Sequence, residues 1–474
     1  MFIGKDIEIS RRAFLRRSSQ LAVAGAASSY ALGLAGMGEA AAFSTAGGYK
    51  ALVCVFLYGG NDHANTFIPF DEANYARYAA VRGDAADGGI GLSRASLAGT
   101  VLNQPSDQEL TDGVQFALAP TMPRMARLFK NARMAPLLNV GPLVVPLTKA
   151  QFESDDNTRY PRPAKLFSHN DQQSTWQSSQ PEGSKTGWGG RMGDLAQSSN
   201  SNAMFTAINA SGNAVFLSGQ DALPYQVSTR GAVQIRGLES RVYRNDAVGA
   251  AMHTLLTNHH GHMLQQDHAQ VVARSIEYAR FVNAATAGVN LSTAFPGGNG
   301  LASQLKVVAD LIAARQAMGV TRQVFLVGLG GFDTHNGLIG THEDKLAQVD
   351  AAIDAFYSAT KEMGIADQVT TFTASDFGRT LASNGDGSDH GWGSHHFIVG
   401  GAVNGGRFYG TAPRIGVDGP DDVGSGRLLP TTSVDEYSAT LAKWFGVADG
   451  NLPWVSPNIG RFANPDLGFM RSPY

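Results

Sequence analysis

The chain has 474 residues, a formal net charge of −3 and 43% hydrophobic residues. This length and composition are typical of a globular protein with a large core, and they exclude an intrinsically disordered chain. No basic run follows the first residues, so the charge pattern predicts no nucleic-acid partner. A single cysteine, Cys54, excludes a disulfide within the chain and a cysteine-based metal cluster.

Residues 1–42 have the features of an export signal. Paired arginines in SRRAFLRR precede a weakly apolar run rich in Ala, Gly and Ser, and an A-x-A motif ends at Ala42. This arrangement predicts a twin-arginine signal peptide that is cleaved after Ala42. A membrane anchor is the alternative, but so weakly apolar a run makes a poor transmembrane helix. We therefore expect the twin-arginine translocase to carry the folded protein to the periplasm or another extracytoplasmic space, without a stable transmembrane anchor after cleavage.

Beyond the signal, apolar runs alternate with segments of helical spacing. Residues 49–60 form a continuous apolar run, which predicts a strand buried on both faces. Residues 119–133 have apolar side chains at helical spacing, and residues 134–141 have the composition of a strand. Residues 220–300 are more helical, with a Gly-rich surface loop at their end.

The second half repeats this alternation. Buried strands are predicted at residues 321–331 and 368–375, with a helix over residues 341–364 between them. A further strand at residues 395–403 and a helix at residues 433–446 follow. Alternating strands and helices predict an α/β fold with three layers, α/β/α, around a mostly parallel central sheet. We expect residues 43–474 to form one domain, with its three most apolar strands as parallel neighbours near the centre of the sheet.

Carboxylates and imidazoles recur where three of these strands end. In open α/β sheets, ligands bind beyond the carboxyl ends of the strands. Mixed Asp oxygens and His nitrogens are the ligands that divalent cations use. Each residue alone is explained equally well as a turn former or helix cap, but together they predict a shared site. The candidate metal ligands are Asp62 after the first strand, Asp333 and His335 after residues 321–331, Asp376 after residues 368–375, and Asp389 and His390 in the next loop.

Several segments carry a family resemblance. GGNDHANTFIP, GGFDTHNGLIGTHEDKL, SDFGRT and SDHGWGSHHFIVGGAVNGG resemble, in this order, the signature segments of the bacterial domain-of-unknown-function family 1501. The resemblance also includes SHNDQQSTWQ and TGWGGRMGDL, so it covers essentially the whole mature chain. That family is similar in turn to the alkaline phosphatase and sulfatase superfamily. The resemblance implies an exported protein with an alkaline-phosphatase-like α/β domain and a site for one or two divalent ions, with zinc, manganese and calcium all left open.

The superfamily plan matches this sequence only in part. Asp62 matches the first ligand, and the pair Asp333 and His335 resembles a later Asp–His pair with shorter spacing. Asp376 stands where an adjacent Asp-His is expected, but Phe377 follows it and cannot ligate a metal. The last ligand corresponds to His390, with His396 as the second choice. The departure at Phe377 leaves three outcomes open: Asp389 compensates for it, one metal binds, or none does.

The resemblance also implies a nucleophile on a loop that leads into a helix. Ser168 fits this place, and Thr66 is the alternative. A serine hydroxyl needs a metal or a base to lower its pKa, so the metal would activate it. Ser168 is also explained as a helix cap, because Asp171 follows at a capping-box spacing. Arg379 would clamp the oxyanion of a tetrahedral group, since a guanidinium binds such oxygens in bidentate fashion.

Two functions of different class follow. The first is an exported metal-dependent hydrolase that acts on phosphate or sulfate esters of a small molecule or a polymer. The second is a non-catalytic exported protein with a degraded site, which binds a cell-surface polymer or a partner protein. Three tryptophans would suit sugar stacking in the second case, namely Trp176, Trp188 and Trp392. Phe377 favours the second function, and the density of Asp and His favours the first.

The export signal gives a first testable prediction. Changing Arg11→Lys together with Arg12→Lys should leave the precursor in the cytoplasm, because the translocase recognises the paired guanidinium groups and not positive charge alone. Cell fractionation and immunoblotting of the precursor and the mature chain measure this. Normal export of the double variant would show that the N-terminal segment is not a twin-arginine signal.

Overall fold

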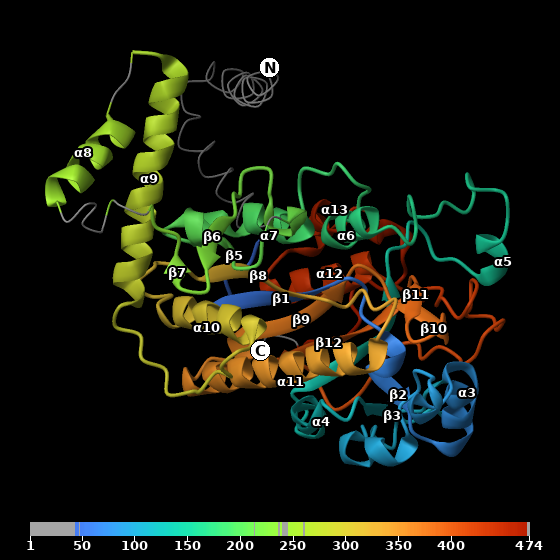
Figure 1. Ribbon diagram of the computed structural model, residues 1–474. Coiled ribbons are helices and arrows are strands. Elements are labelled where there is room, and N and C mark those ends of the chain that lie inside the picture. The colour runs from blue at the N-terminus through green and yellow to red at the C-terminus, as the bar shows by residue number, and fades with distance from the viewer. Residues whose placement is uncertain are drawn as a thin grey trace.

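The computed structural model describes residues 43–471 except residues 47, 213, 236–237, 239–244 and 259–260. The predicted signal peptide therefore lies outside the described residues. Within the described part of the chain, no helix combines the length and the apolar character needed to cross a membrane. A ten-stranded sheet forms the centre, and helices cover both of its faces (Figure 1). The predicted three-layer α/β/α architecture is confirmed.

The central sheet is mostly parallel. Its order is β13-β4-β12-β9-β1-β8-β5-β6-β7, with β14 paired to β4. Strand β12 runs antiparallel to both neighbours and β7 antiparallel to β6, whereas the other pairs are parallel. The strands are β1 (Lys50–Tyr58), β4 (Met134–Gly141), β5 (Ala207–Asn209), β6 (Tyr225–Ser228), β7 (Gly231–Ala232), β8 (Arg322–Gly330), β9 (Val369–Ser375), β12 (Ser394–Gly400), β13 (Tyr409–Gly410) and β14 (Thr432–Ser433). Two small antiparallel sheets pair β2 (Phe67–Pro69) with β3 (Phe116–Leu118), and β10 (Arg379–Ser383) with β11 (Ser388–His390).

The three most apolar strands lie side by side, as predicted. Strand β1 lies between β8 and β9 and is parallel to both. Leu57, near the end of β1, is in register with Leu329 of β8 and Ser375 of β9. The carboxyl ends of the three strands therefore meet at one edge of the sheet, and the loops that leave them start next to one another.

Alternate residues of β1 face two separate helical layers. Val53 and Val55 pack in the core under α4, α10 and α11, whereas Leu52 and Cys54 pack in the core under α6, α7, α12 and α13. Burial on both faces explains why the strand is apolar at every position. The helices of the two layers are α4 (Pro123–Lys130), α10 (Gly300–Ala313), α11 (Leu338–Glu362), α6 (His169–Ser178), α7 (Trp188–Ala196), α12 (Val434–Phe445) and α13 (Leu452–Val455).

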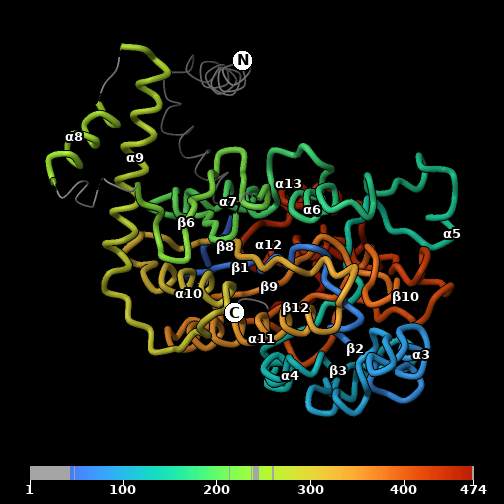
Figure 2. The backbone as a smooth tube through the Cα atoms, in the orientation of Figure 1, coloured from blue at the N-terminus to red at the C-terminus, as the bar shows by residue number. Residues whose placement is uncertain are grey.

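The remaining helices lie outside these layers. The helical hairpin of α8 and α9 extends away from the sheet, as the tube shows (Figure 2). Helix α11 begins at Leu338, earlier than the predicted start at Thr341, because Gly337 (φ 59°) turns the chain into the helix without a side-chain cap. The α-helices outside the two layers are α3 (Glu72–Arg82), α5 (Lys149–Phe152), α8 (Asp246–Thr257) and α9 (Met263–Thr286).

The close approach of two strand-end loops gives a stability prediction. Gly59 follows β1 with φ 116°, and a Cβ atom there would overlap the backbone nitrogen of Asp333. Gly48 has φ 72° but no neighbouring atom within 4 Å of its Cβ position. We expect Gly59→Ala to lower the free energy of unfolding by about 3 kcal/mol and the control Gly48→Ala by only about 1 kcal/mol. Urea denaturation measures both, and equal losses would show that the contact with Asp333 is unimportant.

Candidate metal site

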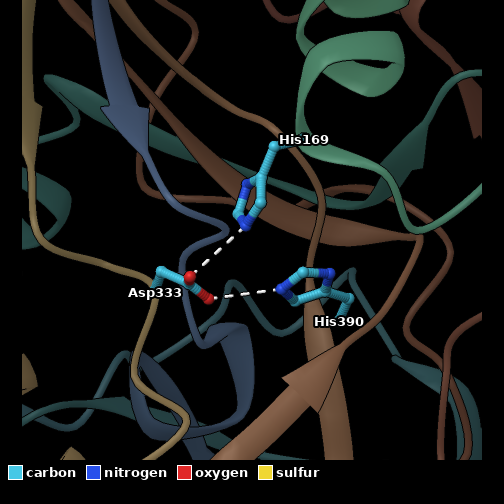
Figure 3. A group of neighbouring side chains, drawn as sticks. All are labelled: His169, Asp333 and His390. Carbon is cyan, nitrogen blue, oxygen red and sulfur yellow. Dashed lines mark hydrogen bonds and ion pairs between the residues drawn. The ribbon is translucent and has the colours of Figure 1, made fainter.

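Three side chains from distant parts of the chain converge at the carboxyl edge of the sheet. His169 is the first residue of α6, Asp333 lies in the loop after β8, and His390 ends β11. Each offers one ligand atom, and these atoms lie within 4.8 Å of one another (Figure 3). Their side chains are 30%, 44% and 23% exposed, respectively. The cluster is therefore accessible from solvent, as a binding site must be.

The Asp333 carboxylate is the centre of this cluster. Its Oδ2 atom lies 3.4 Å from Nε2 of His169, and its Oδ1 atom lies 3.3 Å from Nε2 of His390. A third imidazole, His335, places its Nε2 3.2 Å from Oδ1. In a tetrahedral zinc site with bonds of about 2.0–2.1 Å, neighbouring ligand atoms are roughly 3.3–3.4 Å apart. Each imidazole thus lies at about this spacing from an oxygen of Asp333, His169 from Oδ2 and the other two from Oδ1.

The other ring nitrogen of each imidazole lies against an oxygen atom. This is the arrangement found around most metal-ligating histidines, because an acceptor at Nδ1 fixes the ring and leaves the Nε2 lone pair for the metal. The oxygens are Oδ2 of Asp376 at 2.6 Å from His169, Oδ1 of Asp389 at 3.2 Å from His335, and the carbonyl of Phe167 at 2.8 Å from His390.

The contact between His335 and His390 needs a cation. Nδ1 of His390 carries a proton, since the carbonyl of Phe167 can only accept. The hydrogen bond from Asn384 lowers the pKa of Asp389, so this carboxylate is ionised and accepts from Nδ1 of His335. The two Nε2 atoms, 2.9 Å apart, then present lone pairs to each other when both rings are neutral. Such a contact is repulsive unless a cation is shared: a proton held between the nitrogens fits 2.9 Å, whereas two ligands of a tetrahedral zinc ion would be roughly 3.3–3.4 Å apart.

The electrostatics of the cluster also suit a cation. Burial acts to raise the pKa of Asp333, but the hydrogen bond and charge of Arg379 outweigh it and lower the pKa, so this carboxylate is negative. Burial lowers the pKa of His390, which favours its neutral, ligating form. The hydrogen bond to Asp376 raises the pKa of His169. A metal ion would therefore displace a proton more readily from His390 than from His169.

Comparison with known proteins identifies the family. The family model described as "Protein of unknown function (DUF1501)" matches residues 49–451. The chain belongs to this family. None of the curated proteins compared with the chain matches it.

Three solved structures illustrate what the fold of the DUF1501 protein is similar to. PsFucS1 sulfatase from Pseudoalteromonas sp. is 11% identical, with a TM-score of 0.35 over 85% of this chain and 68% of its own. The lipoteichoic acid synthase LtaP from Listeria monocytogenes is 8% identical, with a TM-score of 0.32 over 90% and 75%. The C-terminal periplasmic domain of EcEptC from Escherichia coli is 11% identical, with a TM-score of 0.32 over 91% and 92%.

Two residues predicted to act directly at the site of the DUF1501 protein are instead buried beneath it. Asp376 is fully buried, and besides His169 it accepts hydrogen bonds from Gln173 (2.8 Å) and from the Gly59 amide (3.2 Å). Arg379 is also fully buried, and its Nη1 donates to Asp333 at 2.9 Å. In this geometry Asp376 orients His169 and Arg379 orients Asp333, so Arg379 does not face solvent as an oxyanion clamp.

Asp389 also orients a neighbouring ring, because its Oδ1 lies against Nδ1 of His335 and not at the centre of the cluster. Asp333, His335 and His390 are thus the predicted ligands that the fold brings together. His169 was missed. It directly follows Ser168, and the only sequence signal for it is its place at the start of a predicted helix, which is too weak to separate it from a structural histidine.

The structure does not bring Asp62 into the cluster. Its carboxylate is fully buried, with Oδ2 2.6 Å from Nη2 of Arg82. Burial acts to raise the pKa of Asp62, but the Arg82 charge holds it well below the usual range. Oδ2 also accepts from Ser388 Oγ at 3.1 Å, and Oδ1 accepts from the Asn65 amide at 3.0 Å. The side chain is therefore fully engaged on the side of α3, and its link to Arg379 runs through Ser388.

The two candidate nucleophiles differ in access. Ser168 is the N-cap residue of α6, but its hydroxyl caps no backbone group and donates to Oδ2 of Asp171 at 2.9 Å. It is partly exposed and adjacent in sequence to His169. Thr66 is fully buried and donates to the carbonyl of Asp62 at 2.7 Å. Only Ser168 is accessible to an ester.

Several aromatic and histidine candidates belong to the core. Phe377 is fully buried, and its ring lies 4.9 Å from that of His169 and 4.5 Å from that of His390, so it forms an apolar floor under the cluster. His396 is buried in β12 against Thr373. The three tryptophans considered for sugar stacking are also buried and provide no stacking surface: Trp176, Trp188 and Trp392.

The buried pair gives a prediction that separates structure from metal binding. We expect Arg82→Leu to lower the free energy of unfolding by about 3–5 kcal/mol, because it leaves the Asp62 charge buried and uncompensated. The double variant Asp62→Asn with Arg82→Leu should recover part of that loss. Chemical denaturation measures both. If Asp62 were a metal ligand, Asp62→Asn would instead lower metal content, which mass spectrometry of the metal detects.

Proposed function

We propose that this protein is an exported, zinc-dependent hydrolase of phosphate or sulfate esters. The observation that carries the proposal is the convergence of His169, Asp333 and His390, whose ligand atoms lie within 4.8 Å of one another, with Nε2 of His335 3.2 Å from Asp333 Oδ1. Imidazole nitrogens with one carboxylate suit zinc, whereas calcium prefers oxygen ligands alone. Phe377 stands where the resemblance to the superfamily implies a further ligand, so the donor set supports one ion better than two.

The residues around the cluster have separable tasks. A zinc ion held by Asp333 and the imidazoles would act as a Lewis acid toward an ester oxygen. Arg379 keeps Asp333 in its ionised form and in a fixed orientation. Ser168 supplies a hydroxyl next to His169, and Asp171 is placed to accept its proton at 2.9 Å. Attack of Ser168 Oγ on the phosphorus or sulfur atom would form a seryl ester and break the bond to the alcohol, which leaves with the proton from Ser168. Attack of water on the seryl ester would then release phosphate or sulfate and restore the hydroxyl.

A non-catalytic metal-dependent binding protein is the second candidate. The hydroxyl of Ser168 is already committed to Asp171, and the alternative hydroxyl of Thr66 is buried. If neither group attacks an ester, the cluster would bind zinc and a ligand without turnover. Both candidate functions use the same metal site, and they differ only in whether the Ser168 hydroxyl attacks an ester.

Metal analysis of variants tests the site. Protein purified from the exported fraction should contain about one zinc per chain, and His335→Ala or His390→Ala should weaken zinc binding at least tenfold, since each removes a ligand. The control His253→Ala, in the distant α8, should keep its zinc. Inductively coupled plasma mass spectrometry measures the content. Full zinc content in both site variants would refute the proposed ligands.

Hydrolysis assays then separate the two candidates. Wild-type protein should hydrolyse p-nitrophenyl phosphate or p-nitrophenyl sulfate. Ser168→Ala should lose this activity while keeping its zinc, because the hydroxyl is not a ligand. A zinc-loaded wild-type protein that hydrolyses neither ester would favour the binding protein.

A further inference from the structure

The hairpin of α8 and α9 extends away from the body of the protein (Figures 1 and 2). Helix α9 has 24 residues, which corresponds to a length of about 36 Å. Its C-terminal half packs on the body, where Val282 is buried and the rings of Tyr278 and Phe281 contact Phe205. Its N-terminal half, residues 263–275, extends beyond these contacts.

One face of α9 continues from the packed half into the projecting half. Leu264, Val271 and Tyr278 are seven residues apart, so they lie in one row along the helix. Tyr278 packs against the body, but Leu264 is 66% and Val271 51% exposed. On the neighbouring helix α8, Leu255 is 71% exposed. An exposed apolar row of this kind suits association with another protein.

Two charged residues beside this row indicate which partner the helix binds. Asp267 and Arg274 are both exposed, lie on the same side of the row, and stand four residues before and three residues after Val271. When two such helices pair antiparallel about a two-fold axis near Val271, Asp267 of each copy faces Arg274 of the other. A parallel pair would instead place like charges together. The pattern is thus complementary to itself in one orientation, as a two-fold interface requires.

We propose that the mature protein forms a two-fold dimer through the projecting half of α9. Val271 lies at the centre of the interface, Leu264 lies toward each end, and two Asp267–Arg274 ion pairs flank the apolar row. A membrane is a poorer partner for this surface, because residues 263–274 contain one Asp and one Arg and lack the cluster of basic residues that membrane-binding helices carry. The dimer is independent of the metal site.

Charge exchange tests the identity of the partner. Sedimentation velocity of residues 43–474 should show a dimer at micromolar concentration. Asp267→Arg and Arg274→Asp should each weaken it several-fold, because each places like charges opposite each other at two points. An equimolar mixture of these two variants should form a dimer again, and so should the double variant. Only pairing of α9 with a second copy of itself predicts both recoveries.

Two further variants complete the experiment. Val271→Asp should weaken the dimer at least tenfold, since it places two carboxylates at the apolar centre. Leu223→Asp, at an exposed leucine outside α9, is the matched control and should leave the dimer unchanged. The far-UV circular dichroism spectrum should be the same in all variants, which shows that the body is folded. A monomeric wild-type protein, or charge variants that dimerise as the wild type does, would overturn the proposal.

Discussion

One buried guanidinium connects the ends of the three central strands. Arg379, just after β9, donates from Nη1 to the Gly59 carbonyl after β1 at 3.1 Å and to Asp333 after β8 at 2.9 Å. Nε of the same side chain donates to the carbonyl of Ser388 at 3.1 Å. Because a charge this deeply buried is stable only when its donors are paired, these contacts determine where the three loops lie. The place of Asp333, and hence of the whole cluster, depends on them.

Around Asp333, the fold surrounds the imidazoles with oxygen atoms that set their orientation. The buried carboxylate of Asp376 orients His169, and the Phe167 carbonyl orients His390. Phe167 has φ 72°, an unfavourable conformation for a large side chain, and this conformation directs its carbonyl to the ring. Backbone strain of this kind persists where the surrounding structure enforces it, which is common at functional sites.

The position of a residue at a strand end predicted which loops meet, but not the direction of each side chain. Asp62 and Asp333 both follow glycine-rich strand ends, yet Asp62 is turned toward Arg82 and away from the cluster. Arg82 lies on the next helix, and no local pattern shows that its guanidinium reaches back to the strand end. His169 is far in sequence from the three strand ends, so the spacing of residues in the strand-end loops gave no signal for it.

The sequence by itself determined the layers of the fold and the edge at which the site lies. Apolar character at every position of β1 records burial on both faces, and this local property is enough to place β1, β8 and β9 at the centre of a parallel sheet. Only the tertiary structure decided which side chains form the site. Ligand directions depend on distant partners, such as Arg379 for Asp333 and Asp376 for His169, whose approach is set by packing of the whole chain and not by neighbouring residues.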